Sequence, residues 1–261
     1  MAEAGRAVAG RYWRKRRIAA GGIADGWQAG DLATGRPVAV WLLRTDCDVD
    51  AGRFLAAARR VAQVRHPGIA RLQDYGQASP EGLPFLVTES VAAASLSAIV
   101  HAGPPDPAWV LEIIFQVASA VGAAHDAGLA HLDIEPGSLL LGPGGAVKVT
   151  AFGLAPGAGN AGRDLYALGL VAWACLTGKP DGRPLPLLPP TVPEGIAGLA
   201  ADLTAADPAA RPASAAEVVA RCRDLMAAPM RIAESRHPGG HHDTLLLDPP
   251  APRSPELAKI A

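Results

Sequence analysis

The sequence predicts an α+β fold in two lobes, a small lobe rich in β-strands followed by a larger helical one. Up to residue 89 the chain consists of short strand-like runs of apolar residues separated by turns. After residue 90 the apolar residues recur at helical spacing in longer runs. We therefore divide the chain into residues 10–90, residues 91–228 and a last segment, residues 229–261. That segment is rich in Pro, Gly and His, and we expect it to be disordered.

The small lobe is expected to hold about five strands and one helix. In the strand RPVAVWLLR successive side chains alternate between faces, so Ala39, Trp41 and Leu43 share one face. The helix ends before His66-Pro67. The expected strands cover residues 11–29 (two, around a turn with Gly21 and Gly22), 36–44, 69–76 and 83–89, and the helix covers residues 54–64.

The large lobe is expected to be helical. Its longest segment is amphipathic, and another, GRDLYALGLVAWACLTG, is almost entirely apolar and fits a buried helix. Ser214 has the position of an N-cap and Glu217 that of its capping-box partner. No apolar run reaches the 18 or so residues of a membrane span, so we expect no transmembrane segment. The expected helices cover residues 95–100, 107–127, 163–178, 196–205 and 213–226.

Composition restricts the class of protein. With 261 residues, 49% of them hydrophobic, the chain can bury one large core or two small ones. A net charge of −1 gives no electrostatic reason to bind nucleic acid. The three cysteines, Cys47, Cys175 and Cys222, form no C-x-x-C motif, and the N-terminal order of apolar and basic residues is unlike a signal peptide. We therefore expect reduced thiols and a cytoplasmic location.

One stretch, AHLDIEPGSLLL from Ala130 to Leu141, combines a polar loop with a following apolar strand, and AFG follows at residues 151–153. This pattern resembles the loop H-R-D-x-K-P-x-N and the later D-F-G of protein kinases. VAVWLLR, LTGKP and DPAARP resemble further kinase segments and occur in the same order. The chain is identified as a degenerate, pseudokinase member of the bacterial (Hanks-type, actinobacterial) Ser/Thr protein kinase family, with a two-lobed kinase-like fold.

The resemblance implies that residues needed for ATP chemistry have been replaced. A kinase needs a cation on the phosphates, an acid to hold that cation, and oxygen ligands for Mg²⁺. Glu135 replaces the loop lysine, and a like charge about 4 Å from a phosphate costs roughly 4 kcal/mol at a dielectric constant of about 20. We therefore expect no bound ATP, Mg²⁺ or other metal, and no enzymatic activity. The other replaced positions are Trp41 (lysine), Ala57 (glutamate), Ser138 (asparagine) and Ala151 (aspartate), and the remnant of the nucleotide cleft comprises Gly21, Gly22, Ala39, Thr88, Glu89, Val91 and Leu140.

The structural residues of the family are kept. By resemblance, His131, Phe152 and Asp164 form the apolar column and its anchor, with Val61 above them. Asp133, at the catalytic-base position, has two interpretations: a base for a hydroxyl, or a residue that hydrogen-bonds the loop backbone. The activation segment between Gly153 and Asp164 is short. Arg211 lacks the glutamate that it pairs with in kinases, so we expect it to pair elsewhere or to face solvent.

The last segment contains a candidate phosphorylation site, Thr244, followed by three leucines and an acid. Phosphorylation there would add nearly two negative charges, which forkhead-associated domains recognise. The arrangement resembles actinobacterial pseudokinase domains associated with cell-wall precursor export. The alternatives are that the leucines pack on the helical lobe or that the segment has no role. His237, His241 and His242 lack partners with metal-ligand spacing, so we expect no metal site there.

These inferences favour a signalling scaffold or adaptor, with an active Ser/Thr kinase and a forkhead-associated-domain protein as partners and recruitment to the membrane through them. Two alternatives remain: a weak or atypical Ser/Thr protein kinase that uses Asp133, and a small-molecule sensor whose cleft is reshaped by Trp41 and Gly26. The basic cluster of the first strand could bind an anionic surface, but we favour a solvated strand edge. That cluster comprises Arg11, Arg14, Lys15, Arg16 and Arg17.

Overall fold

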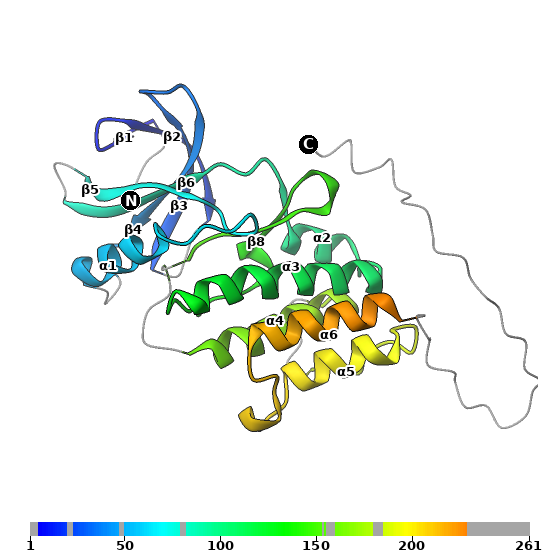
Figure 1. Cartoon of the computed structure of the whole chain (residues 1–261). Coiled ribbons are helices and arrows are strands. Elements are labelled where there is room, and N and C mark those ends of the chain that lie inside the picture. The colour runs from blue at the N-terminus through cyan, green and yellow to red at the C-terminus, as the bar shows by residue number, and fades with distance from the viewer. Residues whose placement is uncertain are drawn as a thin grey trace, which may run out of the picture.

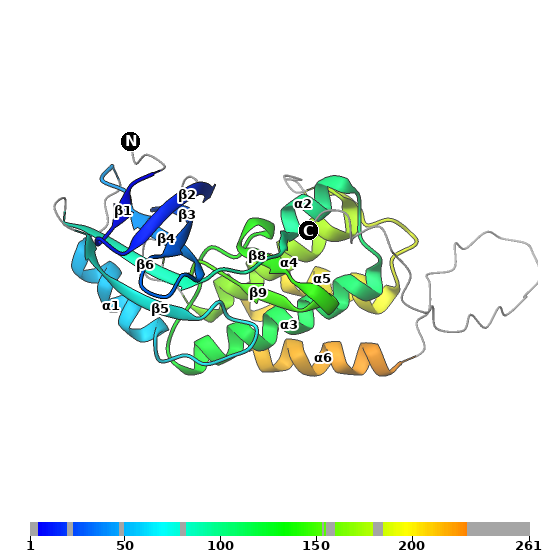
Figure 2. The same ribbon diagram turned by 90° about the horizontal axis from the view of Figure 1, so that it is seen from above.

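The computed structural model describes residues 5–19, 23–46, 50–78, 82–152, 154, 160–179 and 185–228, which fold into two lobes (Figure 1). In these residues a sheet and helix α1 form the small lobe, and five helices with a short three-stranded sheet form the large lobe. The view from above shows the lobes side by side, with the chain passing from one to the other after strand β6 (Figure 2). The predicted two-lobed α+β class is confirmed.

The small lobe is built on a six-stranded antiparallel sheet with the order β1-β2-β3-β4-β6-β5. The strands predicted from the sequence are all present, with an additional two-residue strand at the start. Gly21 and Gly22, predicted to form the first turn, lie outside the described residues. The strands are β1 (Ala7–Val8), β2 (Tyr12–Ala19), β3 (Ala24–Asp31), β4 (Pro37–Leu43), β5 (Leu72–Ala78) and β6 (Leu83–Glu89).

Strand β4 separates two apolar clusters, as its alternating side chains predict. Val38, Val40 and Leu42 belong to a cluster on one face of the sheet. Trp41 and Leu43 belong to a different cluster on the other face. The predicted assignment of faces is therefore confirmed.

Helix α1 (Ala51–Val61) covers the face of the sheet that carries Trp41, through Phe54 and Ala58. It begins three residues earlier than predicted because Asp50 caps it, accepting a hydrogen bond from the Arg53 backbone N–H at 3.0 Å. The prediction started the helix at the first large apolar residue and missed this cap.

The large lobe packs its helices around the central helix α3. Helix α3 lies against α4 and α6, and α4 lies against α5. Gly169 permits the close approach of α4 and α5, since a Cβ atom there would lie 2.7 Å from Leu203 Cβ. The helices are α2 (Leu96–Ala102), α3 (Pro107–Asp126), α4 (Ala161–Thr177), α5 (Glu194–Leu203) and α6 (Ala215–Ala227), and the strands are β7 (Ala94–Ser95), β8 (Leu139–Leu141) and β9 (Val147–Val149).

The cap of α6 differs in one respect from the predicted capping box. Ser214 Oγ accepts from the Glu217 N–H at 3.2 Å, as predicted. The Glu217 carboxylate, however, accepts from the N–H of Ala213, one residue before the cap, at 2.8 Å. Both bonds satisfy donors at the start of the helix that have no partner within it.

By length and composition alone, helix α3 could cross a membrane. From the sequence, no segment of the chain was predicted to meet this test. Half of this stretch is buried inside the protein. A helix at the centre of a lobe needs apolar residues on most of its faces because it packs against several neighbours. The lobe is thus compatible with a soluble protein.

Strand β1 pairs only with Tyr12 and Trp13 of β2, so the basic residues 15–17 stay at the edge of the sheet with exposed side chains, as predicted. Arg11 donates two hydrogen bonds to Asp31, at 2.7 and 2.8 Å. Arg14 is buried and stacks on Trp27, with its guanidinium carbon 5.1 Å from the ring centroid. Arg11 and Arg14 are thus used within the small lobe, whereas Lys15, Arg16 and Arg17 are exposed.

Candidate functional site

The loop between α3 and β8 is anchored by one buried carboxylate, Asp164, near the start of α4. Its two oxygens accept from the backbone N–H groups of His131 and Leu132 at 2.7 and 2.6 Å. His125 Nε2 lies 2.8 Å from Oδ2. Burial raises the pKa of Asp164, but the hydrogen bonds from His125, His131 and Leu132 outweigh it and lower the pKa below its usual value. The loop is held by an ionised, fully paired acid.

His131 connects this anchor to the segment after β9. Its Nδ1 accepts from the Asp133 N–H at 3.2 Å, so the proton resides on Nε2, which donates to Thr150 O at 2.7 Å. The ring meets Phe152 edge to face, with centroids 4.5 Å apart. Burial lowers the pKa of His131, which favours the neutral ring. We call Asp164, His125, His131 and Phe152 the hub.

Two residues beside the hub have a left-handed backbone without being glycine. Leu132 has φ 69° and Ala151 has φ 66°. Each such residue costs roughly 1–2 kcal/mol, which the surrounding structure must supply. The bond from Leu132 N–H to Asp164 and the packing of Phe152 supply it here.

The predicted structural residues are brought together. Phe152 and Val61 lie in the same core cluster of the large lobe, so a residue of α1 in the small lobe reaches this core. His131 contacts Phe152 directly, and Asp164 anchors the backbone of His131. The residues expected to hold the two lobes together do meet.

The position of the kinase lysine is filled by a packed indole. Trp41 is 9% exposed, and a Cβ atom on Gly26 of the neighbouring strand would lie 2.8 Å from its Cζ3. Ala151 packs against the same cluster, which joins the small lobe to the segment after β9. The indole Nε1 has no hydrogen-bond partner among the residues that the structure describes. This cleft cluster comprises Ile23, Ala24, Trp41, Leu43, Phe54, Ala58, Leu86 and Leu154.

The usual metal positions do not fit Mg²⁺. Ser138 donates to Glu135 O at 2.9 Å and accepts from Glu135 N–H at 3.1 Å, so its hydroxyl is engaged in the local turn. Ala57 and Ala151 carry no oxygen on their side chains. Across the described parts of the chain, no group of three or more His, Cys, Asp or Glu could hold a metal ion.

Asp133 and Glu135 differ in their surroundings. The Asp133 side chain is exposed, and no described residue donates a hydrogen bond to its carboxylate. Its interpretation as a hydrogen-bond acceptor for the loop backbone is therefore wrong for the described residues. Partial burial, and then the charge of Asp133, raise the pKa of Glu135. The loop thus presents an exposed carboxylate, with no donor among the described residues, at the position of a base.

The remnant cleft is partly reinforced by contacts that the sequence did not reveal. Ala39 and Thr88 are opposite each other on β4 and β6. Glu89 forms an ion pair with Lys148 of β9, Nζ to Oε1 2.6 Å, which ties the small lobe to the large one. Val91 and Leu140 are half-buried, in the segment after β6 and in β8. His125 was also missed, because its partner is 39 residues away and no local pattern marks it.

Arg211 and the cysteines have structural roles. Arg211 donates to Ala205 O at 2.8 Å and lies 4.5 Å from the Tyr166 ring centroid, so it pairs elsewhere, as one prediction stated. Burial raises the pKa values of Cys175 and Cys222 to about 12, which keeps them as unreactive thiols. Cys47, most of the predicted short activation segment, the three tail histidines and Thr244 lie outside the described residues.

Comparison with known proteins identifies relatives of this architecture. A family model described as protein tyrosine and serine/threonine kinase matches residues 19–177. The serine/threonine-protein kinase PknA of Mycobacterium tuberculosis is 32% identical over 252 residues, covering 78% of this chain and 58% of that protein. PrkC of Bacillus subtilis is 28% identical over 305 residues, covering 98% and 47%. The chain therefore spans about half the length of these two relatives.

These findings correct one prediction. The matched relatives are named serine/threonine-protein kinases, and the matching family model extends over β4, the loop and the hub. The prediction that the chain is not an enzyme is wrong by this comparison, which points to an enzyme. That prediction had taken the replaced residues to decide the class of protein.

Proposed function

Because this chain belongs to the bacterial serine/threonine protein kinase family, we propose that it is a signalling domain with weak, atypical phosphotransfer activity. The observation that carries the proposal is the exposed carboxylate of Asp133, which accepts no hydrogen bond from a described residue, on a loop held by the hub. In this proposal Asp133 takes the proton of a serine or threonine hydroxyl on a protein substrate.

The geometry supports this role for Asp133 through position. The Asp133 N–H donates to His131 Nδ1, and His131 Nε2 in turn donates to Thr150 O, which fixes the backbone that carries the carboxylate. A general base must come within reach of the substrate hydroxyl, and the exposed side chain of Asp133 is accessible to one. The chemistry that the described residues supply is proton acceptance alone.

Weak nucleotide binding is part of the proposal. The cleft cluster places apolar carbon where the family has a cation, and Glu135 adds negative charge beside the loop. We expect ATP with Mg²⁺ to raise the melting temperature of the chain by little or nothing. A clear rise that depends on Mg²⁺ would show that the cleft binds nucleotide well and that activity is not limited by binding.

Transfer of labelled phosphate from ATP to a generic protein substrate tests the base directly. We expect slow incorporation by the full chain and a loss of about 10²-fold or more in Asp133→Asn. Asp126→Asn, at the exposed end of α3, is the matched control and should retain the rate. Absence of incorporation by the unaltered chain, or equal rates in the two variants, would rule out this proposal.

A second candidate function, compatible with weak activity, is that of a scaffold or adaptor. The cleft cluster favours it, because Trp41 stiffens the junction of the lobes and counts against a small-molecule sensor in the cleft. In this proposal an active Ser/Thr kinase phosphorylates Thr244 and a forkhead-associated-domain protein binds it. We also place the chain in the cytoplasm, with recruitment to the membrane through such partners.

Phosphorylation mapping tests the adaptor proposal. The full chain is incubated with an active kinase of the same family, and its sites are mapped by mass spectrometry. We expect phosphate on Thr244 and binding of a forkhead-associated domain that Thr244→Ala abolishes and Ser254→Ala does not. Phosphate found only at other positions would remove Thr244 from the proposal.

A further inference from the structure

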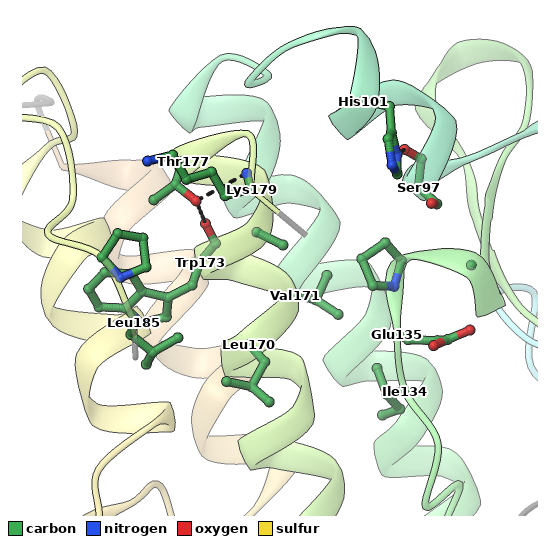
Figure 3. Close-up of a pocket in the computed structure, with 14 residues that line it drawn as sticks. Ser97, His101, Ile134, Glu135, Leu170, Val171, Trp173, Thr177, Lys179 and Leu185 are labelled. Carbon is green, nitrogen blue, oxygen red and sulfur yellow. Dashed lines mark hydrogen bonds between the residues drawn. The ribbon is translucent and has the colours of Figure 1, made fainter. Parts of the chain in front are cut away.

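Two surfaces apart from the cleft between the lobes differ in their charge. A groove of about 510 Å³ opens on the large lobe between α2, the loop and α4, and both polar and apolar side chains line it (Figure 3). Lys179 and Glu135 lie on opposite walls of the groove, so its charge favours neither an anion nor a cation. Strand β2 of the small lobe, by contrast, contains four cations and no acid in its eight residues. The charge of β2 therefore favours an anionic ligand.

Two of these four cations are available to a ligand. Arg14 is buried, and Arg17 forms an ion pair with Asp25, Nη2 to Oδ1 2.5 Å. Lys15 and Arg16 are exposed, and no acid of the described residues pairs with either of them. Strand β1 pairs with β2 only before residue 14, so it does not cover these two side chains.

An exposed indole lies on the same face of the sheet as these two cations. Trp13 is opposite Gly30 of β3, and directly opposite residues of an antiparallel pair share a face. A Cβ atom on Gly30 would lie 3.5 Å from Lys15 Cε, so Lys15 is on this face as well. Arg16 is opposite Gln28, two residues from Gly30, which places it there too. Trp13, Lys15 and Arg16 therefore form one surface.

Leu32 extends this surface with a second exposed apolar side chain. The Leu32 N–H donates to Arg11 O at 2.9 Å, so the antiparallel register continues one step beyond β3. Leu32 is two residues beyond Gly30, which places it on the face of Trp13. Leu32 is 62% exposed and Trp13 44% exposed. We call Trp13, Lys15, Arg16 and Leu32 the edge patch, which combines unpaired cations with uncovered apolar side chains.

We propose that the edge patch binds the surface of an anionic lipid bilayer. The negative surface potential of such a bilayer attracts lysine and arginine, and tryptophan is enriched at the interface between lipid and water. An acidic protein would need the cations alone, whereas the exposed indole and leucine favour a surface with an apolar layer beneath its charges. Figure 1 shows β1 and β2 at the end of the small lobe that lies farthest from the large lobe, where a flat bilayer can reach them.

This contact differs from recruitment through partner proteins, and it does not depend on phosphotransfer. Both views show β2 and the helices of the large lobe at opposite ends of the molecule (Figures 1 and 2). A chain bound through the edge patch therefore holds the large lobe, which carries Asp133, away from the bilayer. The exposed edge of the sheet then has a function in addition to its protection against pairing with other strands.

Sedimentation of the full chain with lipid vesicles tests the proposal. With vesicles of equal parts phosphatidylserine and phosphatidylcholine we expect binding that weakens as salt is added, and with pure phosphatidylcholine much weaker binding. Each basic residue at an anionic surface strengthens binding about fivefold, so the double variant Lys15→Ala, Arg16→Ala should bind roughly 25-fold more weakly. The matched control Arg53→Ala, Arg59→Ala removes two exposed arginines of α1 and should weaken binding less than about twofold. Equal binding to the two kinds of vesicle, or equal losses in the two double variants, would overturn the proposal.

Fluorescence quenching by brominated lipid tests whether Trp13 enters the bilayer. Brominated phosphatidylcholine in the anionic vesicles should quench the fluorescence of the full chain. Trp13→Phe should lose most of this quenching, because the other two indoles of the small lobe, Trp27 and Trp41, are buried. Equal melting temperatures of all variants show that the fold is intact. Quenching that persists in Trp13→Phe would assign the contact to another surface, and binding to polyglutamate without binding to anionic vesicles would assign the edge patch to an acidic protein. Either result would overturn the proposal.

Discussion

The hub and the cleft cluster lie next to each other, yet they treat polar groups in opposite ways. In the hub, Asp164 and His131 are buried. Both carboxylate oxygens of Asp164 and both ring nitrogens of His131 have hydrogen-bond partners within 3.2 Å. In the cleft cluster, apolar side chains surround Trp41, whose Nε1 lacks a partner among the described residues. Phe152 packs in the large-lobe core, and Leu154, two residues later in the chain, packs in the cleft cluster. The same fold thus combines a buried polar network with a neighbouring apolar cluster built around Trp41.

The largest effect is expected from breaking the hub with Asp164→Ala. This change removes the acceptor for two buried N–H groups and for His125, and it releases the left-handed Leu132. We expect a loss of about 3–5 kcal/mol in the free energy of unfolding, measured by urea denaturation. Asp126→Ala, which removes an exposed acid, should cost less than about 0.5 kcal/mol. Similar losses in the two variants would mean that the hub contributes no special stability.

A somewhat smaller effect is expected from Trp41→Ala in the cleft cluster. Removing a buried indole costs about 3 kcal/mol, because the cavity relaxes only partly. Trp41→Lys should cost at least as much, since it places an unpaired ammonium among apolar residues. Adding Ala57→Glu should recover roughly 1–3 kcal/mol by providing a counter-charge. If Trp41→Lys alone were as stable as the unaltered chain, the cluster would be open to water and the contrast with the hub would fail.

The sequence predicted the fold well because its signals are local. The period of two in β4 placed Trp41 on the correct face, and the predicted helices of the large lobe are present. The errors arose where a partner is distant or lies outside the element. Asp50 extended α1 by a cap, and the two-residue strand β1, which pairs with the start of β2, was not predicted.

The site was predicted less completely, for the same reason. The resemblance located the hub residues except His125, whose bond to Asp164 depends on how α3 and α4 pack. The link between Glu89 and Lys148 spans 59 residues and could not be inferred from either segment. The prediction that the chain is not an enzyme rested on the replaced residues. It was wrong because the replacement of some residues does not by itself remove a protein from the class of enzymes.

A moderate effect is expected from Gly26→Ala, a substitution that tests how tightly the cleft cluster is packed. A new Cβ would meet Trp41 Cζ3 at 2.8 Å, so we expect a loss of about 1–3 kcal/mol in the free energy of unfolding. In a Trp41→Ala background the same change should cost less than about 0.5 kcal/mol, because the ring is gone. Gly30→Ala in the same strand is the matched control, since its Cβ would lie 3.5 Å from flexible Lys15 Cε. Additive losses in the double variant would show that Gly26 and Trp41 do not touch.

The smallest effect is a dependence of stability on pH that originates in two histidines, His131 of the hub and His66 outside it. Burial lowers the folded-state pKa of His131, and burial followed by the charge of Lys148 lowers that of His66. Below about pH 6.5 the unfolded chain takes up these protons before the folded chain does, so stability falls as the pH decreases. Above about pH 6.5 both states are neutral at these rings and the contribution is constant.

The slope measures how firmly each ring is held neutral. One proton taken up only by the unfolded chain gives at most about 1.4 kcal/mol per pH unit, measured by urea denaturation between pH 7 and pH 5. His131→Gln should reduce this slope, and His66→Gln, whose ring bonds Gly68 N–H and Ser119 Oγ at 3.0 and 3.2 Å, should reduce it separately. An unchanged slope in His131→Gln would mean that the hub tolerates a charged imidazole. Asp164, already ionised beside that ring, would then be compensating the charge, and the hub would resemble an ion pair more than a network of neutral donors and one acid.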